Sequence, residues 1–188
     1  MEEIDGEDFK NRNGQTSPLE IGEYDNCSFL SCDFSGFDFG DFVFSECEFK
    51  DCNLSNVKLH NTAFKDVKFV NCKLVGLGFN FCNAFLFEVG FQSCDLSLTS
   101  FYQRSLKQTV FADCSLHEVD FVEADLSQSQ FNNCDLSLAV FENTNLEKAD
   151  LSSSHGFSID PELNKIKKAK FSRSELHGLL GKHDIEIV

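Results

Sequence analysis

The sequence predicts an all-β fold, a four-sided solenoid of stacked coils. Large apolar side chains recur every five residues, and six cysteines are separated by 20, 20, 22, 20 and 20 residues. Neither a 3.6-residue helix nor a two-residue strand period keeps every fifth side chain on one side, whereas a coil of four five-residue faces does. The six cysteines, one per coil, are Cys32, Cys52, Cys72, Cys94, Cys114 and Cys134.

The five-residue unit reads small, polar, Phe or Leu, polar, polar, and we call the Phe or Leu position i. One register holds 12 units from Tyr24 to Phe79, and a second holds 14 units from Leu86 to Leu151. Sorting positions i by four gives columns of like residues, as stacked coils require. One column is expected to form a core ladder of Phe29, Phe49, Phe69, Phe91, Phe111 and Phe131.

The 22-residue interval contains the only register slip, and we expect its two extra residues near Cys82 and Asn83 as a bulge at one corner. Four large residues occupy the small inward position, so the coil is expected to widen there or to turn them outward. Arg104 fits the small inward position least well, because burying an unpaired guanidinium costs much free energy. Its side chain is therefore expected to reach solvent or an acid. The other three are Phe37, Phe42 and Leu77.

The predicted organisation is a cap segment at 1–18, the solenoid at 19–153, and a closing segment at 154–188. Ile166 and Phe171 follow Leu146 and Leu151 by 20 residues, which predicts a last coil around a longer loop. Residues 172–175 have a capping-box pattern, and the apolar stripe after them predicts a short helix that covers the open tube end. The same stripe is a candidate homodimer interface, formed by Leu176, Leu179, Leu180, Ile185 and Ile187.

Composition narrows the function classes. The cysteine column predicts reduced thiols that pack as small hydrophobes, because zinc needs four converging ligands and no Cys-x-x-Cys pair is present. No metal or other cofactor is expected. Five scattered histidines and the lack of a phosphate-binding loop or nucleophile motif predict a protein that is not an enzyme.

The net charge of −15 is unevenly divided, since residues 1–155 carry −16 and residues 156–188 carry +1. Direct nucleic-acid binding is disfavoured, because phosphate contacts need basic patches. The charge favours a partner with a basic surface, and generic solubility of the rod is the alternative. No apolar run approaches the length of a membrane span and no secretion signal is visible, so we expect a cytoplasmic protein without membrane contact.

Two units, Ala124-Asp125-Leu126-Ser127-Gln128 and Ala149-Asp150-Leu151-Ser152-Ser153, resemble the consensus of the pentapeptide-repeat family. The resemblance covers residues 19–153 and implies a right-handed quadrilateral β-helix. The interruption at 80–87 and the ending from Ile159 to Leu180 are similar to the gyrase-interacting branch, which includes the microcin-B immunity and albicidin-resistance proteins.

This narrower resemblance implies a homodimer joined through its C-terminal helices. It also implies an acidic rod that mimics duplex DNA, binds DNA gyrase or topoisomerase IV, and confers immunity or resistance to a gyrase-targeting toxin or drug. The competing hypothesis is a structural scaffold or adaptor for an unrelated protein. If gyrase is the partner, the candidate acidic patch consists of Glu118, Asp120, Glu123, Asp125, Glu142 and Glu147.

Overall fold

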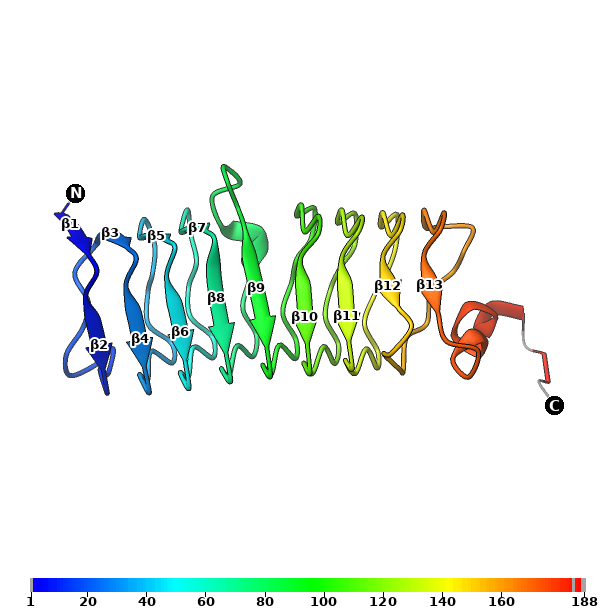
Figure 1. Ribbon diagram of the computed structural model, residues 1–188, viewed down its shortest axis with the longest axis horizontal. Coiled ribbons are helices and arrows are strands. Elements are labelled where there is room, and N and C mark those ends of the chain that lie inside the picture. Colours follow the sequence, from blue (N-terminus) through cyan, green and yellow to red (C-terminus); the bar gives the residue numbers. More distant parts are fainter. Residues whose placement is uncertain (1, 184, 187–188) are drawn as a thin grey trace.

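The computed structural model describes residues 2–183 and 185–186, which form a single rod of stacked coils (Figure 1). Two parallel sheets run along the rod, one of nine strands in the order β13-β12-β11-β10-β9-β8-β6-β4-β2 and one of four in the order β1-β3-β5-β7. The nine strands are β2 (Asp8–Lys10), β4 (Ser28–Leu30), β6 (Glu48–Lys50), β8 (Val67–Val70), β9 (Val89–Gln92), β10 (Val110–Ala112), β11 (Gln130–Asn132), β12 (Asp150–Leu151) and β13 (Lys170–Phe171). The four are β1 (Glu2–Asp5), β3 (Gly22–Asp25), β5 (Val43–Ser45) and β7 (Ala63–Lys65).

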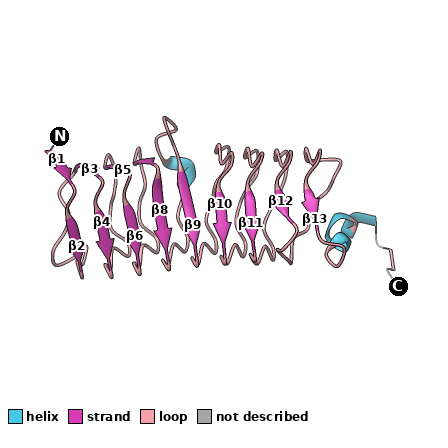
Figure 2. Cartoon of the chain, viewed as in Figure 1, coloured by secondary structure: helices cyan, strands magenta, loops and turns pink. Residues whose placement is uncertain are grey.

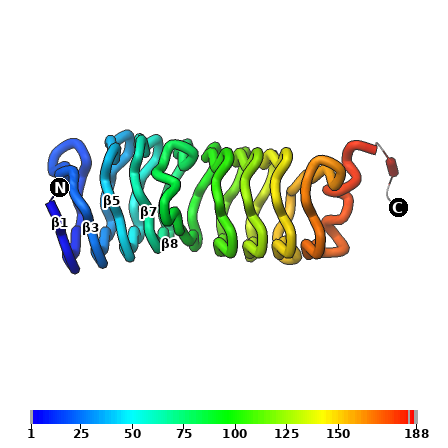
Figure 3. The backbone as a smooth tube through the Cα atoms, turned by 90° about the horizontal axis from the view of Figure 1, so that it is seen from above, coloured from blue at the N-terminus to red at the C-terminus, as the bar shows by residue number. Residues whose placement is uncertain are grey.

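The remaining two faces are joined by isolated parallel bridges, such as Asp33↔Asn53 and Asp38↔Lys58, at the same 20-residue register. Helical structure is confined to three short 3-10 turns, η1 (Phe79–Phe81), η2 (Leu176–Leu179) and η3 (Gly181–His183) (Figure 2). Seen from above, the chain winds steadily from one end of the tube to the other (Figure 3). The fold is therefore the predicted all-β, right-handed quadrilateral β-helix.

Corners are made by the last residue of each five-residue unit, which adopts a left-handed conformation. Most of these residues are Asn, Asp, Gln, Glu, Ser or Gly, as Asn56 (φ 57°) and Glu123 (φ 57°) illustrate. Asn and Asp tolerate this conformation better than most residues, and glycine tolerates it best. The corner N–H donates to the next coil, as from Asn56 N to Val75 O at 2.9 Å. Every coil is thereby tied to its neighbour.

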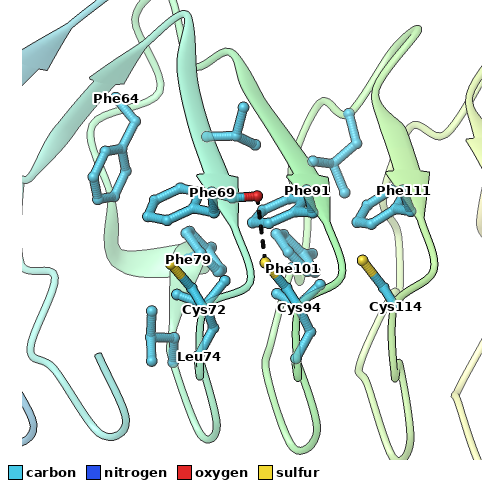
Figure 4. Close-up of a cluster of buried hydrophobic side chains, with 14 of the residues drawn as sticks. Phe64, Phe69, Cys72, Leu74, Phe79, Phe91, Cys94, Phe101, Phe111 and Cys114 are labelled. Carbon is cyan, nitrogen blue, oxygen red and sulfur yellow. Dashed lines mark hydrogen bonds between the residues drawn. The ribbon is translucent and has the colours of Figure 1, made fainter. Parts of the chain in front are cut away.

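The core is a dry stack of rings. From Phe29 to Phe131, consecutive ring centroids of one column lie 4.4 to 5.5 Å apart with interplanar angles of 16° or less (Figure 4). Phe9 adds a further ring, 5.0 Å from Phe29. The next column changes from Phe34 to five stacked leucines, all buried: Leu54, Leu74, Leu96, Leu116 and Leu136.

All nine cysteines are buried and free (Figure 4). Seven of the thiols donate to a backbone carbonyl of the preceding coil, as from Cys94 Sγ to Phe69 O at 3.3 Å. Burial raises the pKa of Cys47 to about 12 and that of Cys82 to about 12, so these thiols stay protonated and unreactive near neutral pH.

The register slip lies slightly later than expected. Asn83 N still donates to Thr62 O in the 20-residue register, whereas Val67 already pairs with Val89 in the 22-residue register. The two extra residues therefore belong to the segment 84–88, which projects from the rod beside β9 (Figure 1). A loop must leave the tube at this corner because the Phe ladder on both sides continues unbroken.

Arg104 has no acidic partner among the described residues; it is only half-buried and lines an open groove. Its Nη2 donates to the carbonyl oxygens of Asn80 and Cys82, the latter at 2.6 Å. The guanidinium also lies over the Phe87 ring, 5.7 Å from its centroid, a cation–π contact. The charged side chain at this inward position is thus held by two backbone carbonyls of the interrupted coil and by the Phe87 ring.

Of the other large inward residues, none is turned fully outward. Phe42 and Leu77 point inward and are buried, and Phe42 stacks on Tyr24 at 6.0 Å. Phe37 is half-buried over Gly14, where a Cβ would lie 3.0 Å from the ring. Gly14 stands where other coils carry Phe or Leu, so its missing side chain leaves room for the Phe37 ring.

The solenoid begins earlier than predicted. Glu2–Asp5 pairs with Gly22–Asp25 and Asp8–Lys10 pairs with Ser28–Leu30, so residues 2–18 form most of the first coil, where a cap segment was expected. Asn11 N and Gly14 N also donate to the next coil, at 2.9 and 2.8 Å. The five-residue spacing of Ile4 and Phe9 carries the register into this segment.

At the other end, the coil continues beyond 153. Asp150 pairs with Lys170 and Leu151 with Phe171, as the 20-residue spacing predicted, with Pro161 in the intervening loop. The capping box does not form, since η2 has no side-chain cap and Glu175 Oε2 instead accepts from Gly156 N at 3.2 Å. Gly178 and Gly181 disfavour a continuous α-helix, which explains the two short turns.

Candidate interaction site: the acidic face

One face of the rod carries five acids and a single lysine. It consists of the outward residues of the units centred on Phe39, Leu59, Phe79, Phe101, Phe121 and Phe141, and we call it the acidic face. Bridges from Asp38 to Lys58 and from Gly78 through Ser100 and Asp120 to Val140 align it along the rod. It lies two faces along the coil from the nine-stranded sheet, and therefore opposite it.

The acids on this face are held by neutral donors. Gln103 Nε2 donates to Glu123 Oε2 at 2.7 Å, and Ser100 Oγ donates to Asp120 Oδ2 at 2.9 Å. Asn61 Nδ2 donates to Asp41 Oδ1 at 2.8 Å. Within the described residues none of the five acids forms a salt bridge. Hydrogen bonds thus hold four of these charges in position, and none of the five is compensated by a salt bridge; the five are Asp38, Asp41, Asp120, Glu123 and Glu142.

The structure divides the acidic patch proposed from the sequence. Asp120, Glu123 and Glu142 lie on the acidic face, and Glu118 lies at the corner that borders it, with Oε1 3.4 Å from His117 Nδ1. The two remaining members, Asp125 and Glu147, belong to the neighbouring face that carries β1, β3, β5 and β7.

Asp125 differs from the acids of the acidic face because a base compensates it. Its Oδ2 lies 3.3 Å from Lys107 Nζ. Burial raises the pKa of Asp125, but hydrogen bonds from Ser127 and Lys107 outweigh burial and hold it below the ordinary range. Asp125 therefore presents less net charge to a partner than its sequence position suggested.

Sequence reasoning missed the apolar residues of the acidic face. Phe81, Tyr102 and Val140 are exposed at outward positions, where the repeat otherwise favours polar residues. The two aromatic residues at outward positions, Phe81 and Tyr102, could have indicated this exposed apolar surface from the sequence.

The proposed dimer residues surround the end of the tube. Gly178 packs on Phe157, where a Cβ would lie 2.2 Å from the Phe157 carbonyl oxygen, and Gly178 O accepts from Ile159 N at 2.8 Å. The turn η2 thereby covers the last coil. Leu176 and Ile185 are exposed, and Leu179 and Leu180 are half-buried. Ile187 lies outside the described residues.

The described residues contain no group of three or more His, Cys, Asp or Glu side chains arranged to hold a metal ion. None of their helices is long and apolar enough to cross a membrane. What the surface offers is a rigid array of charges and exposed apolar side chains, which suits binding of another macromolecule.

A parallel solenoid whose every coil is four five-residue units defines a class of repeat protein. The family model described as "Pentapeptide repeat region" matches residues 23–85 and 84–179, and the chain belongs to the pentapeptide-repeat family. No curated protein sequence matches it.

Solved structures of the same fold include full-length QnrB1, described as a plasmid-mediated fluoroquinolone resistance protein. It is 17% identical, with a TM-score of 0.57, and the match covers 98% of this chain and 100% of that one. A trypsin-treated variant of QnrB1 is 20% identical, with a TM-score of 0.52 and coverage of 99% and 97%. These likenesses concern the fold.

Proposed function

We propose that the protein is a non-enzymatic, DNA-mimicking binding protein that interacts with DNA gyrase or topoisomerase IV. In this role it confers immunity or resistance to a toxin or drug that targets those enzymes. The observation that carries the proposal is the acidic face, where carboxylates without salt-bridge partners project from a rigid rod: Asp38 and Asp41 in one coil, and Asp120, Glu123 and Glu142 in two successive coils further along.

The physical basis is competition for a basic channel. Duplex DNA presents closely spaced negative charges on a stiff rod, and a channel built to bind phosphates attracts any body with a similar charge pattern. This rod is stiff because parallel strands and ring stacks join each coil to the next. Its carboxylates need no reorganisation on binding, because hydrogen bonds already hold most of them.

Two further observations support the proposal. The sequence resembles the gyrase-interacting branch of the family, and QnrB1, a plasmid-mediated fluoroquinolone resistance protein, shares the fold along nearly the whole chain. Gyrase acts on DNA in the cytoplasm, so the proposal also assigns the protein to that compartment.

We further propose a homodimer through the covered end of the tube, with Leu176, Leu179, Leu180 and Ile185 at the contact. Deleting 172–188 should remove η2 from Phe157 and leave a monomer or an aggregate. Sedimentation of the wild-type protein as a monomer at micromolar concentration would refute the dimer.

A supercoiling assay tests the function. Purified protein should inhibit gyrase at high concentration and, at lower concentration, protect it from a gyrase poison. No effect on gyrase or topoisomerase IV up to tens of micromolar, with or without a poison, would reject the proposal and leave the scaffold or adaptor as the better account.

Charge reversal locates the binding surface within the same assay. Changing Asp120, Glu123 and Glu142 to lysine on the acidic face should abolish the effect, because it removes three uncompensated charges and adds three repulsive ones. The control reverses the same number of exposed acids on the opposite face: Glu48, Asp51 and Asp113. Equal losses in the two variants would show that net charge, rather than this face, determines binding.

A further inference from the structure

Exposed apolar side chains gather on the same face as the uncompensated acids. Phe81 is 66% exposed and Tyr102 is 37% exposed, at the outward positions of two successive coils. Leu98 and Leu138 are exposed at the corner that borders this face, and Val140 lies on the face itself. Contiguous exposed apolar groups with a polar rim mark interaction sites.

Phe81 is held in place by the chain beneath it. A Cβ added to Gly78 would lie 2.6 Å from Cδ2 and 2.8 Å from Cε2 of the Phe81 ring. The ring therefore lies across the glycine backbone, and any larger residue at position 78 would displace it. The ring is preorganised, so a partner would not have to immobilise it on binding.

Open grooves lie on both sides of Phe81. One is lined by Lys58 and His60 of the preceding coil and by Gly78, and the other by Asn80, Tyr102 and Gln103. Together they provide space for a side chain of a partner on either side of the Phe81 ring. Asn80 Oδ1, beside this ring, is a buried acceptor without a hydrogen-bond partner among the described residues.

The face is thus divided along the rod. Aromatic residues occupy the coils centred on Phe79 and Phe101, and acids occupy the coils centred on Phe121 and Phe141. A partner that covers both parts must present cations to Asp120, Glu123 and Glu142 and an apolar group to Phe81 and Tyr102. A nucleic acid or an acidic protein surface cannot do this.

We propose that Phe81 and Tyr102 form an apolar anchor site for a basic protein surface that inserts an apolar side chain beside Phe81. This goes beyond DNA mimicry, which requires the charges alone, and it deepens the proposed function by naming a second part of the same binding surface. Attraction by the acids depends on ionic strength, whereas the apolar anchor persists when salt screens them.

Two synthetic peptides of equal charge test the anchor directly. Each carries six lysines; one contains two leucines and the other contains two serines at the same positions. NMR titration should show that the leucine peptide binds about tenfold more tightly, with the largest shifts at Phe81 and Tyr102. Its advantage should remain at high salt. Equal affinities, or shifts centred on another face, would overturn the proposal.

Three variants sharpen this test. Phe81→Ser should remove the advantage of the leucine peptide, and Gly78→Ala should reduce it by displacing the ring without deleting it. Phe85→Ser is the matched control, because Phe85 is 70% exposed but belongs to the projecting loop. If Phe85→Ser weakens binding as much as Phe81→Ser, the anchor has been placed wrongly.

The gyrase assay separates this inference from the proposed function. If wild type and Phe81→Ser protect gyrase equally and the peptides bind equally, the anchor is refuted while the proposed function stands. If the peptides discriminate as expected but gyrase is unaffected by the wild type, the anchor stands and serves another basic partner.

Discussion

The regular coils and the interrupted coil satisfy their outward backbone carbonyls in different ways. In the units centred on Phe111 to Leu146, the carbonyl that follows position i accepts an N–H of the preceding coil, as Glu123 N donates to Glu142 O at 2.8 Å. In the coil that contains the bulge, Phe81 O takes the N–H of Asn61, which leaves the Asn80 carbonyl to Arg104. Backbone pairing in one region is replaced by a single cationic side chain in the other.

The comparison shows where irregularity is tolerated. Both buried polar atoms without a partner in the described chain, Asn80 Oδ1 and Thr99 Oγ1, lie in or beside the interrupted coil. The most exposed aromatic rings, Phe81 and Phe85, lie there too. Stability is distributed approximately coil by coil in such proteins, so a weakened coil can carry interaction residues while its neighbours hold the rod together.

The largest effect is expected from a charge placed in the regular core. Phe111→Asp puts a carboxylate between the rings of Phe91 and Phe131, where no partner is available, and should cost about 4 kcal/mol or more. Thermal unfolding followed by circular dichroism measures the loss. Ser127→Asp, at an outward position, is the control and should change little. Similar melting of the two variants would show that inside and outside are assigned wrongly.

Arg104→Ala should cost about 2 to 4 kcal/mol, because it leaves the carbonyls of Asn80 and Cys82 unpaired at a buried site. Deleting Ala84 and Phe85 should make this substitution harmless. The deletion restores the 20-residue interval and creates the regular unit Cys82-Asn83-Leu86-Phe87-Glu88.

A double-mutant cycle in urea measures the coupling between Arg104 and the loop. We expect Arg104→Ala to be near neutral in the deletion background, where a small residue matches Ala124 one coil further along. An undiminished cost in that background would mean that Arg104 does not act through the bulge.

Thr99→Val should stabilise the protein by about 1 kcal/mol, since it replaces a buried hydroxyl that lacks a partner. Thr144→Val is the matched control in a regular coil. It should destabilise by a similar amount, because Thr144 Oγ1 donates to Phe121 O at 2.8 Å. Equilibrium unfolding in urea distinguishes the two, and a loss of stability in both would show that Thr99 has a hydrogen-bond partner in solution.

The smallest effect concerns pH and the last coil. Hydrogen bonds from Lys170 and Ser152 lower the pKa of Asp150 to about 2. The ionised Asp150 carboxylate therefore stabilises the folded state. This stabilisation is fully present above the unfolded-state pKa of about 3.9 and is lost as pH falls through the folded value. Wild-type stability should therefore decline between those two values more than that of Asp150→Asn. Parallel declines in acid titrations followed by circular dichroism would contradict the assignment.

The repeat made most of the fold predictable, because one spacing determines both backbone register and core composition. The 20-residue rule placed Ile166 and Phe171 correctly even where the five-residue pattern was weak. It did not reveal that residues 2–18 belong to the first coil, since the polar segment 11–18, with Gly14 at position i, interrupts the spacing that Ile4 and Phe9 keep.

The candidate site was less predictable. Which acids share a face depends on which residues form the corners between faces, and the sequence does not show this directly. Glu118 lies at a corner and Asp125 on the neighbouring face. The role of Arg104 could not be read from the sequence, because its partners are backbone carbonyls exposed by a local slip. Backbone groups leave no signal in side-chain patterns.

The central claim is that this rod occupies the DNA site of a type II topoisomerase, and direct displacement tests it most closely. A fluorescent duplex bound to gyrase is titrated with the protein, and anisotropy is followed at low and high salt. The account predicts that anisotropy falls to the value of free duplex at low salt, that displacement weakens as salt rises, and that duplex alone is unaffected by the protein. Anisotropy that stays at the gyrase-bound value up to tens of micromolar protein would contradict it.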